Sequence, residues 1–286
     1  MKKYLAPVLA VIFWGNSFIA TKRALLEISP VTIIILRLLL AVILLTIIAV
    51  YLKRDFRIKL SNHGKILLLA LVAVFHLWIQ ITGLKYTTAA NTGWIIGTAP
   101  VFIAVLGMIF FKEKMNGVKI TGIIIAMAGL MLLISKGDLS GIDFISNKGD
   151  FLVLFSAFTW GVYSIINKKI SLTYSPLMTI LYLFIMMTVL IIPFNLSEET
   201  INSVFHLSAV GWISVIFLGV FCSGIAYVLW AYSLQQMESS SAGAFLYFEP
   251  FVTVTGAWLF LQEIITPLMI VSGLIITAGV VLVNKE

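Results

Sequence analysis

The sequence predicts an all-α polytopic membrane protein with ten transmembrane helices in two five-helix repeats of inverted topology. The first observation behind this is composition, because 61% of the 286 residues are hydrophobic, only 11% are charged and the mean hydropathy is +1.10. Such values exclude a soluble domain with a wetted surface. The second observation is a series of long apolar runs joined by short connections, and the third is a set of motifs shared by the two halves.

Ten runs are predicted to be helices that cross the bilayer, because about 20 mostly apolar residues span its hydrocarbon core. They cover residues 5–24, 30–51, 64–84, 88–111, 117–135, 150–167, 176–194, 209–234, 240–261 and 267–283. Three begin with a hydroxyl-bearing cap before a proline, whose missing N–H costs nothing at a helix start, at Ser29-Pro30, Ser175-Pro176 and Thr266-Pro267. Residues 197–207 begin with a similar cap but are too short to span, which predicts an interfacial helix.

Positive charge predicts the orientation of the chain. If the connections lie alternately on the two sides, thirteen Lys and Arg residues share the side of the termini and five lie opposite. Since cytoplasmic loops retain Lys and Arg, both termini are predicted to be cytoplasmic in a multi-pass protein of the cytoplasmic (inner) membrane. This bias accounts for the net charge of +7, so no nucleic-acid partner is expected. No small-residue cleavage site follows Lys2 and Lys3, so the first helix is expected to stay on the mature protein.

The two halves of the chain repeat one another. An offset of 146 positions relates Phe13-Trp14-Gly15-Asn16-Ser17 to Thr159-Trp160-Gly161-Val162-Tyr163 and also relates Ser29-Pro30 to Ser175-Pro176. An offset of 150 relates Gly93, Pro100 and Glu113 to Gly243, Pro250 and Glu263. One offset shared by separate features argues against chance, so the repeat is expected to cover nearly the whole chain.

The repeat divides the chain into a five-helix unit at residues 1–136, a connecting loop at 137–149 and a second five-helix unit at 150–286. Because each unit holds an odd number of helices, the second unit must enter the membrane from the opposite face. Inverted halves suit alternating access, since rocking of one half against the other presents a central site to either side. Duplication also builds static scaffolds and channels, so that interpretation stays open.

Three stretches of sequence carry a resemblance to a known family. They are Phe13-Trp14-Gly15-Asn16-Ser17-Phe18, Ala89-Ala90-Asn91 through Pro100 to Phe111-Lys112-Glu113-Lys114, and Leu246-Tyr247-Phe248-Glu249-Pro250 through Leu261-Gln262-Glu263. With these motifs the chain resembles the EamA-like ten-helix transporters of the drug/metabolite transporter superfamily. The resemblance implies export of small metabolites, amino acids or drugs across a bacterial inner membrane. Gln262 departs from the pattern, which has a small residue such as glycine before the closing Glu.

Two charged side chains within the predicted spans are functional candidates, Arg37 and Glu249. A charge in hydrocarbon costs about 3 kcal/mol on insertion scales and usually faces a partner or a wet cavity. In a functional interpretation Arg37 holds a carboxylate, Glu249 exchanges a proton or meets a cationic group, and their opposite signs allow an interhelical pair. In a structural interpretation Arg37 snorkels to the interface or bonds to carbonyls of a neighbouring helix, and a protonated Glu249 fills the hydrogen-bonding gap left by Pro250.

Polar and aromatic side chains on several predicted helices are candidates to line a cavity for a small amphipathic ligand. Together with Arg37 the candidate set is Trp14, Ser17, His76, Gln80, Asn91, Trp94, Trp160, Tyr163, Tyr227, Trp230 and Tyr247. The alternative is that the aromatic rings form interfacial belts and the polar groups bond between helices. Pro100 and Pro250 interrupt helical hydrogen bonding at repeat-related places and are candidate hinges.

The leading functional hypothesis is a secondary transporter that exports small organic metabolites such as amino acids, or drugs, by alternating access. Its partners would be the lipid bilayer, a small-molecule substrate and protons as a candidate coupling ion. No phosphate-binding loop, Cys/His metal set or nucleophile with a base appears, so neither a cofactor, a metal nor an enzymatic activity is predicted. The alternatives are a passive channel or facilitator on the same fold and a membrane enzyme or assembly partner that does not transport.

Overall fold

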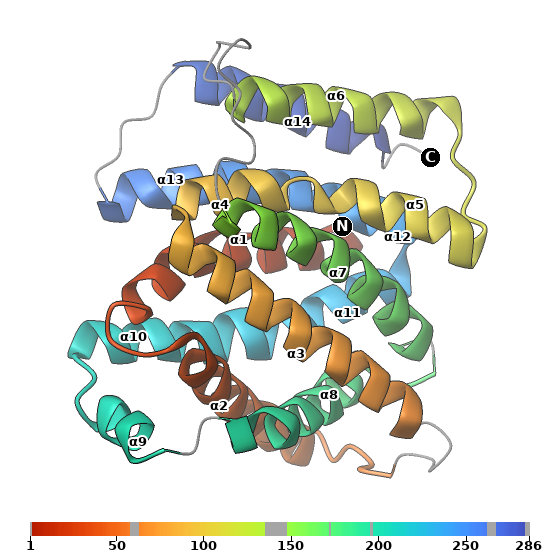
Figure 1. Ribbon diagram of the computed structural model, residues 1–286. Coiled ribbons are helices and arrows are strands. Elements are labelled where there is room, and N and C mark those ends of the chain that lie inside the picture. Colours follow the sequence, from red (N-terminus) through yellow and green to blue (C-terminus); the bar gives the residue numbers. More distant parts are fainter. Residues whose placement is uncertain are drawn as a thin grey trace.

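Every regular element in the described part of the computed structural model is a helix (Figure 1). The structure describes residues 2–57, 63–134, 148–171, 173–194, 197–261 and 267–283. Of the predicted connecting loop 137–149, only residues 148 and 149 belong to this part, as the start of a helix. Gln262, Glu263 and Thr266 lie outside it.

The helices follow the predicted segments closely, and some segments hold more than one helix. The first half contains α1 (Lys2–Ala24), α2 (Pro30–Tyr51), α3 (His63–Tyr86), α4 (Ala89–Ile96), α5 (Ala99–Phe111) and α6 (Gly117–Ile134). The second half begins with α7 (Lys148–Ser171), α8 (Pro176–Ile191), the 3₁₀ turn η3 (Ile192–Phe194), α9 (Glu198–Phe205) and α10 (Ala209–Phe217). It continues with the π-helical segment η4 (Leu218–Ile225), α11 (Ala226–Gln236), α12 (Ser239–Ala244), the 3₁₀ turn η5 (Phe245–Phe248), α13 (Glu249–Leu261) and α14 (Pro267–Val283).

Hydroxyl caps start several helices as the sequence predicts. The Ser29 hydroxyl accepts a hydrogen bond from the Thr32 amide at the start of α2, and Ser175 caps α8 in the same way. A proline occupies the first helical position in both, where its missing N–H is not needed. Ser197 caps α9, which at eight residues is too short to span a bilayer.

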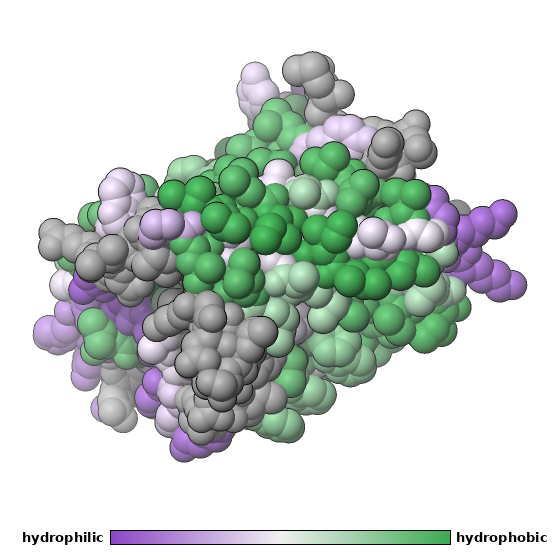
Figure 2. Space-filling view, turned by 90° about the horizontal axis from the view of Figure 1, so that it is seen from above, coloured by the Kyte–Doolittle hydropathy of each residue, from purple (hydrophilic) through white to green (hydrophobic). Residues whose placement is uncertain are grey.

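Seven helical stretches in the described ranges are long and apolar enough to cross a membrane. They are Tyr4–Ala24, Pro30–Tyr51, His63–Tyr86, Thr92–Phe111, Lys148–Ser171, Pro176–Phe194 and Ala209–Gln236, with shorter apolar helices at Gly117–Gly129 and Ile270–Val283. Large apolar side chains such as Ile43, Ile47 and Val189 are exposed on the helix surfaces. Figure 2 shows apolar side chains over most of one face, with hydrophilic groups gathered toward its ends. The chain is therefore an all-helical, multi-pass membrane protein whose outer surface suits lipid.

Two of the predicted helices are broken just before a proline. The segment 88–111 splits at Gly97 and Thr98, between α4 and α5, so that Pro100 is the second residue of α5. The segment 240–261 splits at the turn η5, so that Pro250 is the second residue of α13. The physical cause is the same in both, because proline has no N–H and its ring clashes with the carbonyl four residues earlier.

Helix α1 occupies the middle of the helix assembly. It packs against α4 of its own half and against α10, α11 and α13 of the second half. Helices α6 and α14 instead pack along each other at one edge (Figure 1). A Cβ atom built on Gly279 of α14 would lie 2.6 Å from the Gly122 carbonyl oxygen of α6. Glycine is needed at this crossing because the two backbones approach too closely for a side chain.

A buried ion pair joins the end of α5 to two elements of the second half. Lys168 of α7 donates to the Glu113 carboxylate at 2.9 Å and to the Met237 carbonyl at 3.1 Å. The same carboxylate accepts from the amides of Ser239, at 2.6 Å, and Ser240, at 3.0 Å, at the start of α12. Burial raises the pKa of Glu113, but the hydrogen bonds from Ser239, Lys168 and Ser240 outweigh it and hold the pKa below its ordinary value.

A second carboxylate caps a helix of the other half from the connection between α1 and α2. Glu27 accepts from both the amide and the hydroxyl of Ser208, at 2.7 Å each, at the start of α10. These two hydrogen bonds lower the pKa of Glu27. A negative charge at a helix N-terminus also interacts favourably with the helix dipole. The first half of the chain therefore supplies two carboxylates, Glu113 and Glu27, that cap helices of the second half.

We expect Gly279→Ala to destabilise the protein by about 1–3 kcal/mol, because the added methyl group forces α6 and α14 apart. Gly117→Ala is the matched control, since a Cβ there meets no atom within 4 Å. Thermal unfolding of the purified variants in detergent measures the difference. Equal melting temperatures for the two variants would contradict the close crossing of α6 and α14.

We expect Glu113→Gln to lower the melting temperature at neutral pH, because it removes the charge that Lys168 and the start of α12 need. The folded-state pKa of Glu113 lies below its ordinary value of 4.5, so its carboxylate stabilises the fold fully above about pH 4.5. That contribution is lost as the pH falls through the lower folded-state pKa.

The melting temperatures of wild type and Glu113→Gln should therefore converge in acid. Glu238→Gln is the control, because Glu238 pairs with Lys119 and its side chain is 45% exposed, and exposed pairs contribute little. A gap between wild type and Glu113→Gln that persists unchanged below pH 4.5 would rule out the ionised carboxylate as the cause.

Candidate functional site

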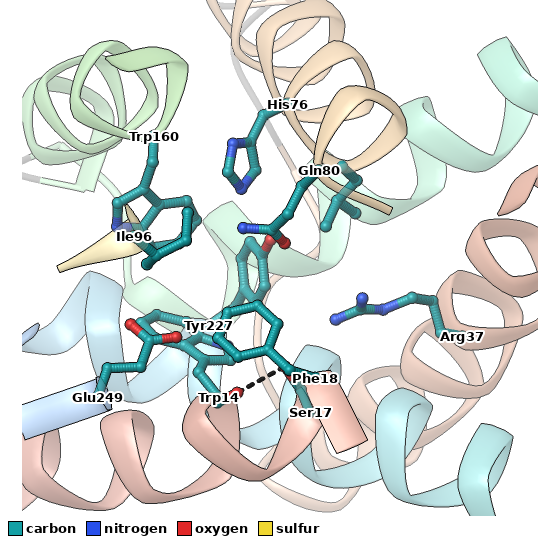
Figure 3. Close-up of a pocket in the computed structure, with 11 residues that line it drawn as sticks. Trp14, Ser17, Phe18, Arg37, His76, Gln80, Ile96, Trp160, Tyr227 and Glu249 are labelled. Carbon is teal, nitrogen blue, oxygen red and sulfur yellow. Dashed lines mark hydrogen bonds between the residues drawn. The ribbon is translucent and has the colours of Figure 1, made fainter. Parts of the chain in front are cut away.

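A small polar and aromatic cavity lies between the two halves of the chain (Figure 3). Its walls come from α1, α2, α3 and the end of α4 in the first half and from α7, α11 and α13 in the second. Eight residues predicted from the sequence line it, namely Trp14, Ser17, Arg37, His76, Gln80, Trp160, Tyr227 and Glu249. Phe18, Leu77 and Ile96, which the sequence did not single out, complete the wall.

Arg37 and Glu249 enter the cavity from opposite sides (Figure 3). Arg37 is only 4% exposed, and its Nε donates to the Ser223 hydroxyl at 2.8 Å. That hydrogen bond fixes the Nε end of the guanidinium group, and the terminal nitrogens of the group point into the cavity. The structure therefore places the Arg37 side chain in the interior of the helix assembly.

Glu249 is the first residue of α13 and is 3% exposed. Within the described ranges, no residue donates a hydrogen bond to its carboxylate or lies in ion-pair contact with it. An ionised carboxylate buried in this way is costly, and a bound cation or proton relieves the cost. Arg37 shares the cavity with Glu249 but is bonded to Ser223, and the interhelical pair that their opposite charges allow is not formed among the described residues.

His76 and Gln80 lie one helical turn apart on α3 and face the same cavity (Figure 3). The His76 Nδ1 atom is 3.0 Å from the Ser156 carbonyl oxygen, which can only accept, so Nδ1 carries the proton. A neutral His76 therefore has Nε2 as an acceptor. The Ser17 hydroxyl donates back to the Trp14 carbonyl at 2.6 Å, which leaves its oxygen lone pairs as acceptors.

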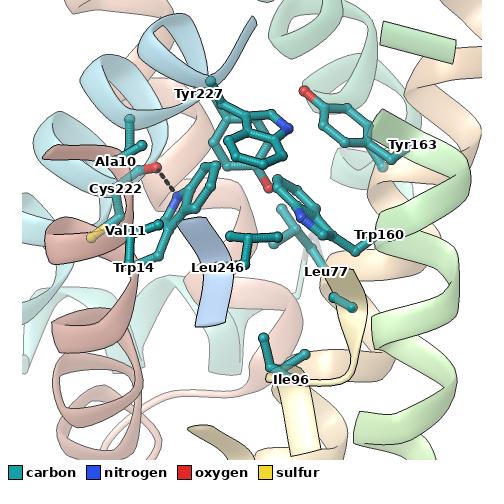
Figure 4. Packing of buried hydrophobic residues seen from close by; sticks show 14 of the residues in the cluster. Ala10, Val11, Trp14, Leu77, Ile96, Trp160, Tyr163, Cys222, Tyr227 and Leu246 are labelled. Atoms are coloured by element: carbon teal, nitrogen blue, oxygen red, sulfur yellow. Dashed lines mark hydrogen bonds between the residues drawn. The ribbon is translucent and has the colours of Figure 1, made fainter. Parts of the chain in front are cut away.

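Aromatic rings from both halves form one side of the cavity (Figure 4). The Trp14 and Trp160 ring centroids are 4.9 Å apart at an interplanar angle of 84°, and Tyr227 meets both edge-on at 5.5 and 5.6 Å. Edge-to-face contacts of this kind are favourable because the ring edge is positive and the face negative. Trp14 and Trp160 are the two tryptophans that the internal repeat relates.

Other predicted residues pack behind this first row of rings. Tyr163 stacks on Trp160 with centroids 4.8 Å apart, and Trp230 contacts both tryptophans of the first row. Both side chains are fully buried. The Trp230 Nε1 donates to Ser164 at 3.2 Å. Tyr163 and Trp230 therefore support the cavity wall and do not line it.

Two further predicted residues, Trp94 and Tyr247, do not line the cavity. Trp94 is buried on α4, and Tyr247 is fully buried in the 3₁₀ turn η5. The Tyr247 hydroxyl has no hydrogen-bond partner among the described residues. The side chain of Asn91 lies outside the part that the structure describes.

The π-helical segment η4 shapes the cavity without being visible in the sequence pattern. Trp14 Nε1 donates to the Cys222 carbonyl at 3.0 Å (Figure 4), and the neighbouring Ser223 holds Arg37. A π-helix shifts the hydrogen-bond register of a helix and so turns carbonyls toward other partners. Gly219 and Gly224 lie in this segment, but glycine at these positions does not by itself predict a π-helix.

A model of the EamA-like transporter family matches residues 1–135 and 147–285 of the chain. An uncharacterized transporter of Archaeoglobus fulgidus is 33% identical, with 100% of this chain and 98% of the relative covered. An uncharacterized transporter of Bacillus subtilis is 26% identical over 98% of this chain and 96% of the relative. A protein of Streptantibioticus cattleyicolor named "Probable terminal-alkyne amino-acid exporter" is 28% identical over 71% of this chain and 67% of its own.

A solved crystal structure has the same fold. It matches with a TM-score of 0.76 at 15% sequence identity, and the match covers 98% of this chain and 96% of the other. At this identity the similarity concerns the path of the backbone alone.

We expect Trp14→Phe to lower stability by about 1–3 kcal/mol, because it leaves the buried Cys222 carbonyl without its donor. Trp212→Phe is the matched control, since Trp212 on α10 is 37% exposed. Thermal unfolding in detergent compares the two variants with wild type. If both substitutions have the same small effect, the hydrogen bond to η4 does not stabilise the fold.

Proposed function

This chain belongs to the EamA-like transporter family, as its motifs indicated, and from that premise we propose that it exports zwitterionic metabolites such as amino acids across the cytoplasmic membrane. The observation that carries the proposal is the placement of a buried cation and a buried anion on opposite sides of one aromatic cavity. The name of the amino-acid exporter from Streptantibioticus cattleyicolor supports the same substrate class.

The cavity offers complementary chemistry to each part of an amino acid. Arg37 presents a planar guanidinium group, which binds a carboxylate through two parallel hydrogen bonds. Glu249 is a suitable partner for an ammonium group, which would neutralise its buried charge. The aromatic rings of Trp14, Trp160 and Tyr227 suit the apolar side chain of an amino acid. The Nε2 atom of a neutral His76 is a hydrogen-bond acceptor that can orient a polar group of the substrate.

Transport requires the cavity walls to separate. The free volume between the lining residues is about 30 Å³, room for about two water molecules, whereas organic ligands occupy cavities of roughly 300 Å³ or more. We propose that ten membrane-crossing helices form two inverted five-helix halves that rock about this cavity. The lining of the cavity by both halves, with Trp14 facing Trp160, supports the arrangement. The helix breaks before Pro100 and Pro250 are the proposed hinges.

Proton coupling is proposed for Glu249. Its carboxylate is buried without a partner in the described ranges, and a buried negative charge is energetically unfavourable. Binding of a proton or of a cationic group neutralises that charge and lowers the free energy of the protein. A proton and an ammonium group would then compete for one site, which is the requirement for exchange of one against the other. The energy source in this proposal is the proton gradient across the membrane.

We expect counterflow of labelled amino acids in proteoliposomes that contain the purified protein. Arg37→Lys should reduce exchange by about tenfold, because a lysine cannot make the bidentate contact. Arg57→Lys is the control, since Arg57 is exposed and outside the cavity. Flux that unlabelled internal solute fails to stimulate would favour a passive facilitator, and the absence of flux for amino acids, nucleosides, sugars and cationic drugs would favour a protein that does not transport.

We expect Glu249→Gln to keep counterflow measurable but to abolish accumulation driven by a pH gradient, because the amide cannot take up a proton. The measurement is uptake with and without an imposed gradient in the same proteoliposomes. Glu238→Gln is the control, because Glu238 is exposed. Gradient-driven accumulation that survives Glu249→Gln would remove Glu249 from the coupling mechanism.

A further inference from the structure

A second and larger hollow lies on the opposite side of α7 from the cavity. It is an apolar groove of about 590 Å³ between α3, α5 and α7. Its walls include Leu68 of α3, Leu106 and Phe110 of α5, and Phe158, Val162 and Ile166 of α7. Trp160 faces the central cavity while Phe158 and Val162 line the groove, so the helix α7 separates the two hollows.

Two lysines line the groove at the same end. Lys65 is in the first turn of α3 and Lys169 is in the last turn of α7. Because α3 and α7 pack along each other in opposite directions, the start of one helix adjoins the end of the other. Both lysine side chains are exposed. The groove is therefore apolar along its length and positively charged at one end.

The length of the groove matches one leaflet of a bilayer. Phe158 and Lys169 are eleven residues apart on α7, which corresponds to about 16 Å along the helix at 1.5 Å per residue. Half of a hydrocarbon core is about 15 Å thick. A groove whose apolar part has this length and whose end is cationic has the dimensions and charge of one phospholipid.

The neighbouring acid, Glu113, is engaged by partners outside the groove. Glu113 follows the end of α5, but its carboxylate is bonded to Lys168 and to the amides of Ser239 and Ser240. Lys112 and Lys114 flank it and are exposed. Four lysines therefore gather around this end of the groove, which favours an anionic headgroup over a zwitterionic one.

We propose that the groove binds an anionic phospholipid of the surrounding bilayer, with an acyl chain along α7 and the headgroup phosphate at Lys65 and Lys169. The lipid would pack against the back of the helix that carries Trp160, and against α5, which touches α7 at Gly161. This site rests on the insertion of the chain in a membrane and does not depend on which solute is transported.

The test is thermal unfolding of the full-length protein in detergent, titrated with phosphatidylglycerol, phosphatidylcholine or inorganic phosphate. Phosphatidylglycerol should raise the melting temperature of wild type more than phosphatidylcholine does, and inorganic phosphate should have no effect. In the double variant Lys65→Gln/Lys169→Gln the apparent affinity for phosphatidylglycerol should fall roughly tenfold or more. The matched control is Lys53→Gln/Lys85→Gln, which removes two exposed lysines outside the groove.

A third variant keeps the test decisive if the double variant fails to fold. Val162→Phe fills the apolar part of the groove and leaves both lysines in place, so it should also weaken the response to phosphatidylglycerol. Native mass spectrometry of the same samples should count fewer retained lipids for both groove variants than for the control. Equal responses of the groove and control variants, or equal effects of phosphatidylcholine or free phosphate, would overturn the proposal.

Discussion

The absence of water from the hydrocarbon core constrains this structure more than any other condition. Every backbone N–H and C=O in a membrane must find a partner within the protein, so irregular backbone is tolerated only where protein surrounds it or where it lines a cavity. Besides the 3₁₀ turn η3 at the end of α8, three helix irregularities occur in the described ranges, the break at Gly97 and Thr98, the π-helical segment at 218–225 and the 3₁₀ turn at 245–248. These three, unlike η3, adjoin the central cavity, through Ile96, through the partners of Trp14 and Arg37, and through Glu249.

Most of the helices could be predicted because a helix that crosses a bilayer is recognisable in the sequence by its length and its apolar composition. The caps at Ser29 and Ser175 and the prolines at the helix breaks are local signals, and they act in the structure as their chemistry requires. The π-helical segment was missed because the eight residues of 218–225 are ordinary apolar and small residues. A π-helix at residues 218–225 and an ordinary α-helix would have the same hydropathy pattern, so the sequence does not distinguish the two.

The candidate site could be predicted in part, and the misses have a common physical reason. Periodicity at 3.6 residues per turn identifies a face but does not separate a first row of side chains from a second, so Tyr163 was grouped with Trp160 although it packs behind it. Trp230 follows the π-helical segment, and Tyr247 lies in a 3₁₀ turn. Helical periodicity loses its phase across both irregularities. The internal repeat relates Trp14 to Trp160 independently of this phase, and both side chains line the cavity.

The ring cluster gives the protein an optical signal of its own. Two indoles whose centroids are 4.9 Å apart at nearly a right angle are close enough for their electronic transitions to couple, and Tyr227 and Trp230 extend the coupled set. Such coupling depends steeply on separation and angle. Because Trp14 belongs to the first half of the chain and Trp160 to the second, the near-ultraviolet circular dichroism and tryptophan fluorescence report the distance between the halves without any attached label.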